Sequence, residues 1–532
     1  MAYNSLFSKT PAIFGDQYAY TMGAVDFKAG EVDRVSTSQI FFRELINNGF
    51  KDGEGEDLKI PYFVVAGLGP FFEWFDNNWK LTDDEATFYA SLKDPGGERI
   101  YPDAYLQYMQ TEPAHISIDA MLEGELAFPD EPIARLTGPH LQVERLEAGL
   151  LNLITAHSGW STIASQFWLA AQRLTKHASL YEFAARRTPE WGGLGTSRSA
   201  YLAGWDGTSN MYAGYTYGIP TAGTMAHAFI MVRESEVEAF TTWVKNMPHM
   251  GVFLVDTYDT IEGVRNAISV CKQHGVKLRG IRLDSGDVDY LSHLVREELD
   301  AAGFKDTIIM ASDSLNVGAI HQIYQVKEAP LNSFGVGGNY STRRQDTKGI
   351  SAVMKAARVN GRNLMKFSNA ADKSTLPGIH DVIRYIEPAK HNGIGHYAGD
   401  TIIPYDLDVG SGRLNREIVS IPRRSPNGVK PFPEGVEFYR PIVSVTKDGK
   451  HLLQEFIDQD SHAVLKNARA RFFHSMQMLA PEHKQIISPR LYIAGIEEGL
   501  LDDQAHRVRA NNLNIQRGRQ ARRFAPAPGK TG

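Results

Sequence analysis

Residues 251–338 constrain the fold more than any other stretch, because four short apolar runs alternate there with helix-length segments. The apolar runs begin at Gly251, Leu278, Thr307 and Ser333, and each ends in a turn of polar residues or glycines. The segments between them cover 261–274, 288–302 and 315–327. Strands that alternate with helices at this spacing are typical of βαβ units, so the stretch predicts a parallel sheet.

Polar side chains gather in the loops that follow these runs. In parallel sheets, such loops carry the ligand-binding residues. Here they contain Arg282, Asp284, the pair Ser312-Asp313 and the double glycine Gly337-Gly338. Arginine binds phosphate oxygens in pairs, glycine backbone N–H groups can close on a phosphate, and aspartate accepts ribose hydroxyls. The pattern therefore favours a phosphorylated sugar as the ligand.

Composition narrows the class of protein. A chain of 532 residues is too long for one hydrophobic core, so we expect two or more domains. The net charge of −6 argues against a general binder of nucleic acid or membrane surfaces. No apolar run approaches the ~20 residues of a membrane span and the N-terminal residues show no signal-peptide h-region, so we expect a cytoplasmic protein. The single cysteine, Cys271, excludes an intramolecular disulfide and a multi-cysteine zinc site, and we expect it to be a buried thiol.

The character of the chain changes twice along its length. Up to about residue 140 the pattern is mixed, and Thr82 with acids behind it predicts a helix N-terminus. After about residue 375, proline and glycine divide the chain into short strands, and Asp448-Gly449 predicts a type I′ hairpin. The last residues, from Arg507 onward, carry six arginines and few apolar side chains, which predicts a solvated, flexible tail.

Ten short segments, in order, resemble the nicotinate phosphoribosyltransferases, with the nicotinamide phosphoribosyltransferases as a sister group. The resemblance runs from about Asp16 to about Leu501. The segments are 18–22, 81–84, 131–132 with 138–139, 182–187, 207–210, 223–227, 256–258, 282–287, 334–337 and 373–378. One segment alone would be weak evidence for the resemblance, whereas ten segments in the same order are specific to the family.

The resemblance implies an activity. Members of the family transfer the phosphoribosyl group of phosphoribosyl pyrophosphate (PRPP) to nicotinate, a step of NAD biosynthesis that releases pyrophosphate. ATP hydrolysis assists through a transient phosphohistidine, and Mg²⁺ is the expected cofactor. The partners implied are the small-molecule substrates nicotinate, PRPP and ATP, and a second copy of the chain in a homodimer with shared active sites.

The resemblance also implies a fold, an irregular (incomplete) TIM-like α/β barrel with a second α/β domain formed by both chain ends. We assign residues 141–394 to the barrel. Residues 1–140 and 395–500 form the two parts of the flanking domain, and 501–532 form the basic tail.

Two catalytic roles follow from the resemblance. His227 corresponds to the phosphohistidine, and an imidazole is a good nucleophile when a neighbour holds its other nitrogen protonated. Glu182 and Asp256 are candidates for that neighbour. The family usually has Ser or Glu after this histidine, whereas this chain has Ala228. Asp284 is expected to stabilise the cationic sugar that forms when the C1–pyrophosphate bond breaks, or to contact the ribose. We assign no residue as a metal ligand.

Four positions are expected to contact PRPP. The resemblance gives Arg186 a phosphate or pyrophosphate contact that helps the leaving group, and Asp313 the ribose hydroxyls. Gly337 and Gly338 correspond to a cradle for the 5′-phosphate. Arg187 is expected to point elsewhere, because neighbours in an extended segment alternate faces. Either of the arginines at 343 and 344 is a further phosphate candidate.

Four positions are expected to hold the pyridine substrate. The resemblance places its ring between Phe183 and Tyr18, with Tyr18 contributed by the other subunit, and its acid group on Arg282. Nicotinamide enzymes have an aspartate where this chain has Ser209. An aspartate 4 Å from a substrate carboxylate would be repelled by about 4 kcal/mol at an effective dielectric of 20, whereas a serine hydroxyl can donate to it. The sequence therefore favours nicotinate.

Three alternatives remain open at this stage. The nearest is a nicotinamide phosphoribosyltransferase. The second is a catalytically inactive barrel that acts as a binding protein. The third, a metal-dependent hydrolase built on Asp256, Asp284 and Asp313, is disfavoured because no paired histidines accompany these acids.

Overall fold

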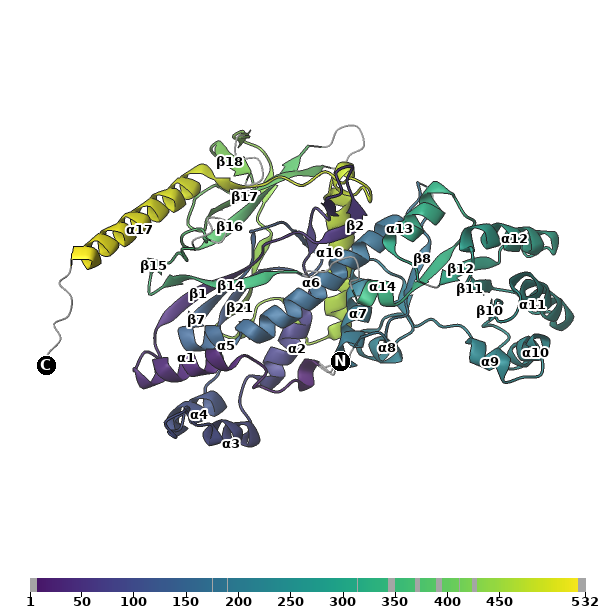
Figure 1. Ribbon diagram of the computed structural model, residues 1–532, viewed down its shortest axis with the longest axis horizontal. Helices are drawn as coiled ribbons and strands as arrows, with labels where there is room; N and C mark the ends of the chain where they lie inside the picture. Colours follow the sequence, from purple (N-terminus) through teal and green to yellow (C-terminus); the bar gives the residue numbers. More distant parts are fainter. Residues whose placement is uncertain are drawn as a thin grey trace.

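The computed structural model describes residues 7–174, 176–188, 190–312, 314–342, 350–368, 374–388, 395–410, 412–422 and 428–524. The fold is mixed α/β, as predicted. In Figure 1 a parallel sheet occupies one half of the elongated molecule, and two further sheets occupy the other half. The long helices α6 (Glu147–Ala170) and α16 (Ser461–Met478) run between the halves.

The parallel sheet contains the four apolar runs as four adjacent strands, which confirms that part of the prediction. In sheet order the strands are β10 (Val252–Leu254), β11 (Gly280–Leu283), β12 (Ile308–Ser312), β13 (Ser333–Val336), β8 (Ser179–Glu182) and β9 (Gly207–Thr208). Every neighbouring pair is parallel. All six strands therefore present their carboxyl ends at one edge, and β10 and β9 leave the sheet open at its sides.

Helices α11 (Thr260–His274) and α12 (Val288–Ala301) begin and end within a residue of the predicted segments. The third segment differs, because α13 (Val317–Ile320) continues as a π-helical turn, His321–Val326. Asp287 caps α12, since its side chain accepts from Tyr290 N, and Asn316 caps α13, since its side chain accepts from Ala319 N. Cys271 is buried in α11 as predicted, and burial raises the pKa of its thiol to about 11.

A second, seven-stranded sheet joins the two ends of the chain. In sheet order its strands are β15 (Arg362–Asn363), β14 (Ala352–Val359), β1 (Val35–Phe42), β7 (Pro132–Pro139), β5 (Ser117–Met121), β21 (Ile442–Lys447) and β22 (Lys450–His451). Strands β5 and β21 pair antiparallel although they are more than 300 residues apart. Strand β14 lies within the range 141–394 that we assigned to the barrel, and it pairs with β1 of this sheet. Asp448 and Gly449 adopt left-handed conformations between β21 and β22, which confirms the predicted hairpin.

A third sheet contains six strands from the C-terminal part of the chain. In sheet order they are β19 (Lys430–Phe432), β18 (Ile418–Pro422), β23 (Ala494–Glu497), β17 (His396–Pro404), β16 (His380–Glu387) and β20 (Phe438–Tyr439). Its fully buried Arg384 forms an ion pair with Asp400 at 2.7 Å and lies 3.6 Å from Glu131, which precedes β7. Burial, and then the neighbouring Asp400, raise the pKa of Glu131 well above its ordinary value. This buried charge cluster joins the third sheet to the second.

Shorter elements complete the two halves. They are η1 (Phe7–Lys9), α1 (Gln17–Lys28), β2 (Asn47–Lys51), β3 (Asp57–Lys59), β4 (Phe63–Val64), α2 (Leu68–Asn78), α3 (Asp83–Ser91), α4 (Asp103–Thr111), β6 (Leu126–Ala127), α5 (His140–Arg145), α7 (Glu190–Leu202), α8 (Met211–Tyr217), α9 (His227–Met231), α10 (Glu236–Asn246), α14 (Gly338–Ser341), α15 (Gln454–Ile457) and η4 (Pro481–His483). Thr82 caps α3 in a reciprocal capping box with Glu85, as predicted.

The basic C-terminal region differs from the flexible tail that its composition suggested. The chain forms helix α17 (Glu498–Phe524), which projects from the body of the molecule (Figure 1). Between 501 and 524 there is no proline and a single glycine, and the Arg507 side chain pairs with Asp503 one turn before it. Gln504 also donates to the backbone oxygen of Thr375 at 3.1 Å. Local helix propensity therefore outweighs the low apolar content.

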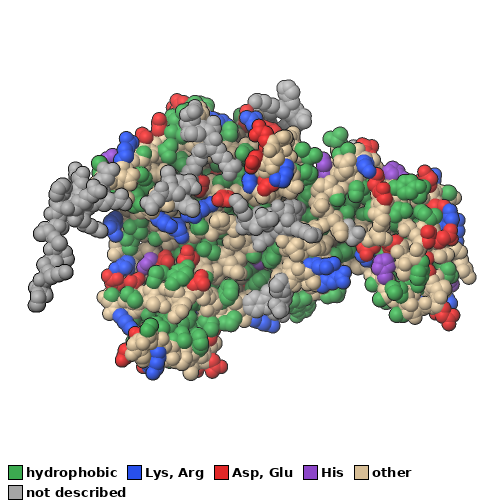
Figure 2. Space-filling model, viewed as in Figure 1, with side chains coloured by type: hydrophobic (Ala, Val, Ile, Leu, Met, Phe, Trp, Pro, Cys, Tyr) green, Lys and Arg blue, Asp and Glu red, His purple; other side chains and the backbone are tan. Residues whose placement is uncertain are grey.

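The surface agrees with the modest net charge. Acidic and basic side chains are interspersed over the face shown in Figure 2. Within the described ranges, no helix combines the length and the apolar character that a bilayer span requires.

Candidate active site

One cavity of about 670 Å³ opens at the carboxyl edge of the parallel sheet. Residues in the carboxyl-terminal parts of β11, β12 and β13, and in the loops after these strands and after β8, line it. They are Phe183, Arg186, Arg187, Arg282, Asp284, Ser312, Ser314, Leu315, Gly335, Gly337, Gly338, Asn339 and Thr342. Six residues predicted to contact substrate thus border one space, because parallel strands bring the loops after them together. Asp313 and the arginines at 343 and 344 lie outside the described residues.

Arg282 stands at the centre of a hydrogen-bond network. Its Nε donates to Ser312 Oγ at 2.8 Å, Nη1 to Thr224 Oγ1 at 2.9 Å and Nη2 to Asp284 Oδ1 at 2.6 Å. Ser312 also donates to Asp284 Oδ1. A guanidinium has five N–H groups, so one remains on each terminal nitrogen for a ligand.

Asp284 is held as an anion by this network. Burial acts to raise its pKa, but the hydrogen bond from Ser312 and the charge of Arg282 outweigh burial, so that the pKa lies below its ordinary value. Its backbone N–H donates to Asp256 Oδ2 at 2.8 Å, which fixes the turn after β11. The cavity therefore contains a fixed negative charge beside a fixed positive one.

His227 is the first residue of α9. It lies behind Asp284, which lines the cavity. Its Nδ1 lies 3.0 Å from Thr257 Oγ1, and its Nε2 lies 3.6 Å from Asp284 Oδ2 and 4.0 Å from Asp256 Oδ1. The buried Asp256 Oδ1 has no hydrogen-bond partner among the described residues. Of the two acids considered from the sequence, Asp256 is thus a neighbour of the imidazole. A proton on Nε2 would be shared with the carboxylates.

Glu182 has a different role from the one considered. It is fully buried, and its carboxylate accepts from Ser197 Oγ at 2.8 Å, Thr208 Oγ1 at 2.6 Å and the backbone N–H of Ala184 at 2.6 Å. Burial raises its pKa despite these bonds. The bonds fix the end of β8 and, with it, the adjacent Phe183.

Phe183 faces the cavity across Gly335. A Cβ at position 335 would lie 2.3 Å from Cε2 of the ring, so only glycine leaves room for the ring in its present place. The ring also lies beside Arg282, whose Cζ is 5.8 Å from the ring centroid. An aromatic face thus stands next to a cation at the edge of the cavity.

Arg186 and Arg187 both line the cavity, whereas an extended segment would have sent Arg187 to the opposite side. The chain turns here instead, and Arg187 N donates to Ala184 O at 2.7 Å. The Arg187 side chain passes beside Gly338, since its Cδ would be 3.8 Å from a Cβ at that position. Two exposed arginines and the double glycine therefore line the same cavity, with Arg187 next to Gly338.

Ser209 and Tyr18 lie outside the cavity lining. Ser209 follows β9, and its backbone N–H and its hydroxyl both donate to the carbonyl oxygen of Glu182, at 2.9 and 3.4 Å. Tyr18, on α1, lies in a separate hollow with Glu147 and Asn152. Within one chain, Tyr18 and Phe183 are therefore not part of the same space.

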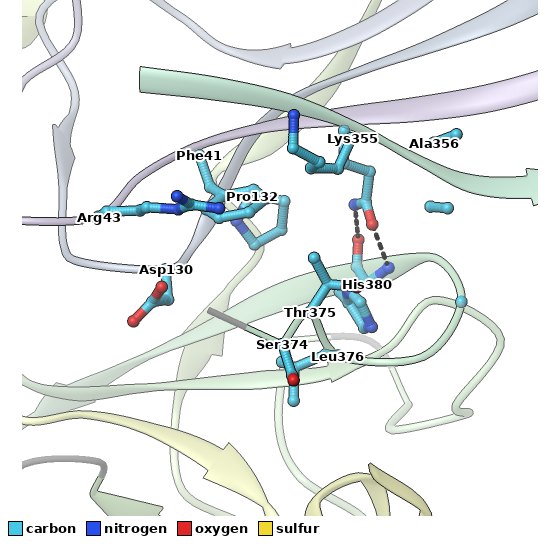
Figure 3. A pocket seen from close by; sticks show the side chains of 13 residues that line it. Phe41, Arg43, Asp130, Pro132, Lys355, Ala356, Ser374, Thr375, Leu376 and His380 are labelled. Carbon is cyan, nitrogen blue, oxygen red and sulfur yellow. Dashed lines mark hydrogen bonds between the residues drawn. The ribbon is translucent and has the colours of Figure 1, made fainter. Parts of the chain in front are cut away.

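A second hollow, on the seven-stranded sheet, is lined by cations. Figure 3 shows Arg43 near Asp130 on one side of the hollow and Lys355 on the other side, and the backbone of His380 makes two hydrogen bonds to the Gln39 side chain. Burial lowers the pKa of Lys355, whereas the nearby Glu147 acts to raise it. Its residues lie in or next to β1, β7, β14, β16 and the loop 374–378, and two of the ten resemblance segments, 131–132 and 373–378, contribute residues to it.

Two hydroxyl side chains of the site, those of Thr224 and Thr257, received no role from the sequence, and Ser312 was named only as part of the pair with Asp313. Each follows or ends an element next to a predicted site residue, so proximity to the strand ends was the available signal. Within the described ranges, no group of three or more His, Cys, Asp or Glu residues is placed to hold a metal ion.

Comparisons with known proteins bear on the family of the chain. The model of the nicotinate phosphoribosyltransferase (NAPRTase) family matches residues 178–391, and the model of its N-terminal domain matches 13–155. Among curated relatives, the chain is 33% identical to nicotinate phosphoribosyltransferase of Bacillus subtilis, covering 75% of this chain and 78% of that protein. It is 30% identical to nicotinate phosphoribosyltransferase 2 of Arabidopsis thaliana, covering 92% and 93%.

Solved structures share the fold. The crystal structure of human nicotinic acid phosphoribosyltransferase superposes with a TM-score of 0.73 at 22% identity, over 92% of this chain and 98% of that chain. Nicotinate-nucleotide pyrophosphorylase from Pyrococcus furiosus superposes with a TM-score of 0.59 at 18% identity, over 86% and 98%. The two family models together span well over half of the sequence, which confirms the resemblance. The chain belongs to the nicotinate phosphoribosyltransferase family and is an enzyme of NAD biosynthesis.

Proposed function

We propose that this enzyme transfers the phosphoribosyl group of PRPP to nicotinate with the assistance of ATP, through a phosphohistidine at His227. The observation that carries the proposal is the cluster of His227, Asp284 and Arg282 at a cavity that also contains an aromatic face and a double glycine. Each substrate group has a matching partner in this arrangement.

Nicotinate fits the side of the cavity that Phe183 and Arg282 form. The pyridine ring would stack on Phe183, and its carboxylate would take the two remaining N–H groups of Arg282. Ser209 lies outside the cavity lining and its hydroxyl donates to the carbonyl oxygen of Glu182, so its contribution is only that it adds no charge to repel the acid. These features favour nicotinate over nicotinamide.

PRPP fits the opposite side. Arg186, and Arg187 with it, would bind the pyrophosphate and stabilise its departure, while Gly337 and Gly338 leave backbone N–H groups free to approach the 5′-phosphate. Asp284, held as an anion, would stabilise the oxocarbenium-like ribose as the C1–O bond breaks. The nicotinate nitrogen then forms the bond to C1. Asp313 is proposed as the ligand of the ribose hydroxyls.

His227 supplies the coupling to ATP. Asp284 and Asp256 near Nε2 favour the tautomer with its proton there, which leaves the Nδ1 lone pair as the nucleophile beside Thr257. Nδ1 would bond to the γ-phosphorus as the bond to the β-phosphate oxygen breaks and ADP leaves. Water later attacks the phosphorus of the phosphohistidine, the N–P bond breaks, and inorganic phosphate and the free imidazole result.

Mg²⁺ is proposed as the cofactor, bound mainly by the phosphate oxygens of the substrates. The donor set suits this mode, since Mg²⁺ commonly takes one or two carboxylates in addition to phosphates, and Asp284 offers one carboxylate at the cavity. When bound, the ion would neutralise charge on the pyrophosphate.

We also propose that two chains share each site in a cytoplasmic homodimer, and that the parallel sheet is the wall of an incomplete barrel. Three features support the dimer. Tyr18 lies outside the cavity of its own chain, its ring is half exposed, and Met22 and Val25 extend the apolar face of α1. In a dimer, Tyr18 would close the pyridine side of the partner's cavity. The hollow that contains Arg43 and Lys355 would then also lie near the partner's cavity.

The test is pyrophosphate release from PRPP with nicotinate or nicotinamide, each with and without ATP and Mg²⁺. We expect turnover with nicotinate that ATP stimulates, and an acid-labile ³²P label from γ-labelled ATP. His227→Ala should remove the label and the stimulation while leaving ATP-independent transfer. His249→Ala, which alters a histidine remote from the cavity lining, is the matched control. A label that survives in His227→Ala would contradict the proposal, as would turnover with nicotinamide alone.

A further inference from the structure

The hydroxyl of Tyr18 is bound by a carboxylate from a distant part of the chain. Tyr18 Oη donates to Glu147 Oε2 at 2.6 Å, although the two residues are 129 positions apart. Tyr18 belongs to α1, whereas Glu147 is the first residue of α6. The Tyr18 side chain is 48% exposed, so core packing does not fix its ring.

Charged groups from two other elements surround this pair. Glu144 of α5 and Lys355 of β14 are close enough to influence each other and Glu147 electrostatically, and Asp16 lies just before α1. Lys355 also lines the cationic hollow of Figure 3. The Glu147 carboxylate therefore accepts from the Tyr18 hydroxyl and also interacts electrostatically with Lys355 of that hollow.

We propose that Glu147 is a positioning residue that fixes the Tyr18 ring in the orientation needed to cover the pyridine substrate. This inference rests on the proposed function, in which Tyr18 closes the partner's cavity. A hydrogen bond from a hydroxyl to a carboxylate is among the stronger ones, and an exposed tyrosine without it would sample several χ1 rotamers. Binding nicotinate would then have to order the ring as well.

A purely structural role predicts something different. A glutamate in the first turn of a helix interacts favourably with the helix macrodipole. That interaction would stabilise α6 and would not affect substrate binding. Loss of a positioning role would therefore raise the KM for nicotinate without changing kcat, whereas loss of a structural role would lower the melting temperature.

The experiment compares Glu147→Ala, Glu147→Gln, Tyr18→Phe and the double variant Tyr18→Phe/Glu147→Ala in the full-length enzyme. We expect Glu147→Ala and Tyr18→Phe each to raise the KM for nicotinate about three- to tenfold, with kcat and the KM for PRPP within twofold of the wild type. Glu147→Gln keeps an oxygen acceptor without the charge and should lie between Glu147→Ala and the wild type. The double variant should be no worse than either single variant, because both remove one interaction.

Glu144→Gln is the matched control, since it removes a neighbouring acid that makes no hydrogen bond to Tyr18 in the described structure. Its KM for nicotinate should equal that of the wild type. Tyr18→Ala tests the underlying site: it must raise the KM for nicotinate if Tyr18 contacts the substrate. A rise in Tyr18→Ala without a rise in Glu147→Ala would overturn the role of Glu147 alone. Additive effects in the double variant would also overturn it, whereas a wild type that does not turn over nicotinate would remove the proposed function and this inference together.

Discussion

Gly335→Ala is the most direct test of how β13 shapes the pyridine side of the cavity. The new methyl group would lie 2.3 Å from Cε2 and 2.6 Å from Cδ2 of Phe183, whereas ordinary contacts of this kind begin near 3.4 Å. The backbone cannot relieve the contact, because β8 and β13 pair through Tyr181 and Gly335, and Phe183 N donates to Val336 O at 2.8 Å. The ring must therefore move by roughly 1 Å or rotate away.

The magnitude follows from the two ways of relieving the contact. If the ring rotates, nicotinate loses a stacking partner that contributes about 0.5–1.5 kcal/mol, which corresponds to a rise in KM of about two- to twelvefold. If the ring stays, overpacking costs about 1–3 kcal/mol of folding free energy. We expect the first outcome, because the ring borders open space on the cavity side.

The assay is steady-state turnover with varied nicotinate at saturating PRPP, together with urea unfolding. Gly53→Ala is the matched control: no atom lies within 4 Å of a Cβ built there, so the same methyl group meets open space. A Gly335→Ala enzyme with the KM for nicotinate and the unfolding free energy of the wild type would refute the reasoning.

Further outcomes concern stability. Glu144→Gln should flatten the pH dependence of the unfolding free energy: burial, and then Glu147, raise the pKa of Glu144 from 4.5 to about 7, so the folded state binds the extra proton and wild-type stability should fall by up to about 3 kcal/mol as the pH rises through that window. Urea unfolding of both proteins between pH 4.5 and 7.5 checks this sign. In the wild type the fully buried Glu123 carboxylate lies 2.6 Å from the Arg198 guanidinium. Arg198→Ala removes this ionic partner and should lower the unfolding free energy by about 3–5 kcal/mol, measured by chemical denaturation. Thr82→Ala removes the capping box of α3 and should cost about 1 kcal/mol, with turnover unchanged.

Local patterns in the sequence were sufficient for the parallel sheet and for the edge at which the cavity lies. Strands β10 to β13 and helices α11 and α12 follow from apolar runs, turns and caps that each lie within a few residues. Because the carboxyl ends of parallel strands meet at one edge, Arg282, Asp284 and Gly337 could be placed in one cavity before any coordinate was known. The α17 helix shows the limit of composition, since low hydrophobicity suggested disorder where helix propensity prevails.

Only the tertiary structure decided which distant groups touch. No periodicity relates β14 to β1, Thr257 to His227, or Glu147 to Tyr18, because such contacts depend on how whole elements pack rather than on neighbours in the chain. The same holds for Arg187, which a turn of the backbone returns to the cavity although its sequence position suggested the opposite face. The sequence by itself therefore determined the class of fold, the family and the loops that form the site. The packing of the strand-end loops against α9 within the parallel-sheet half determined which charges and hydroxyls surround the imidazole, since such contacts depend on positions that local sequence does not encode.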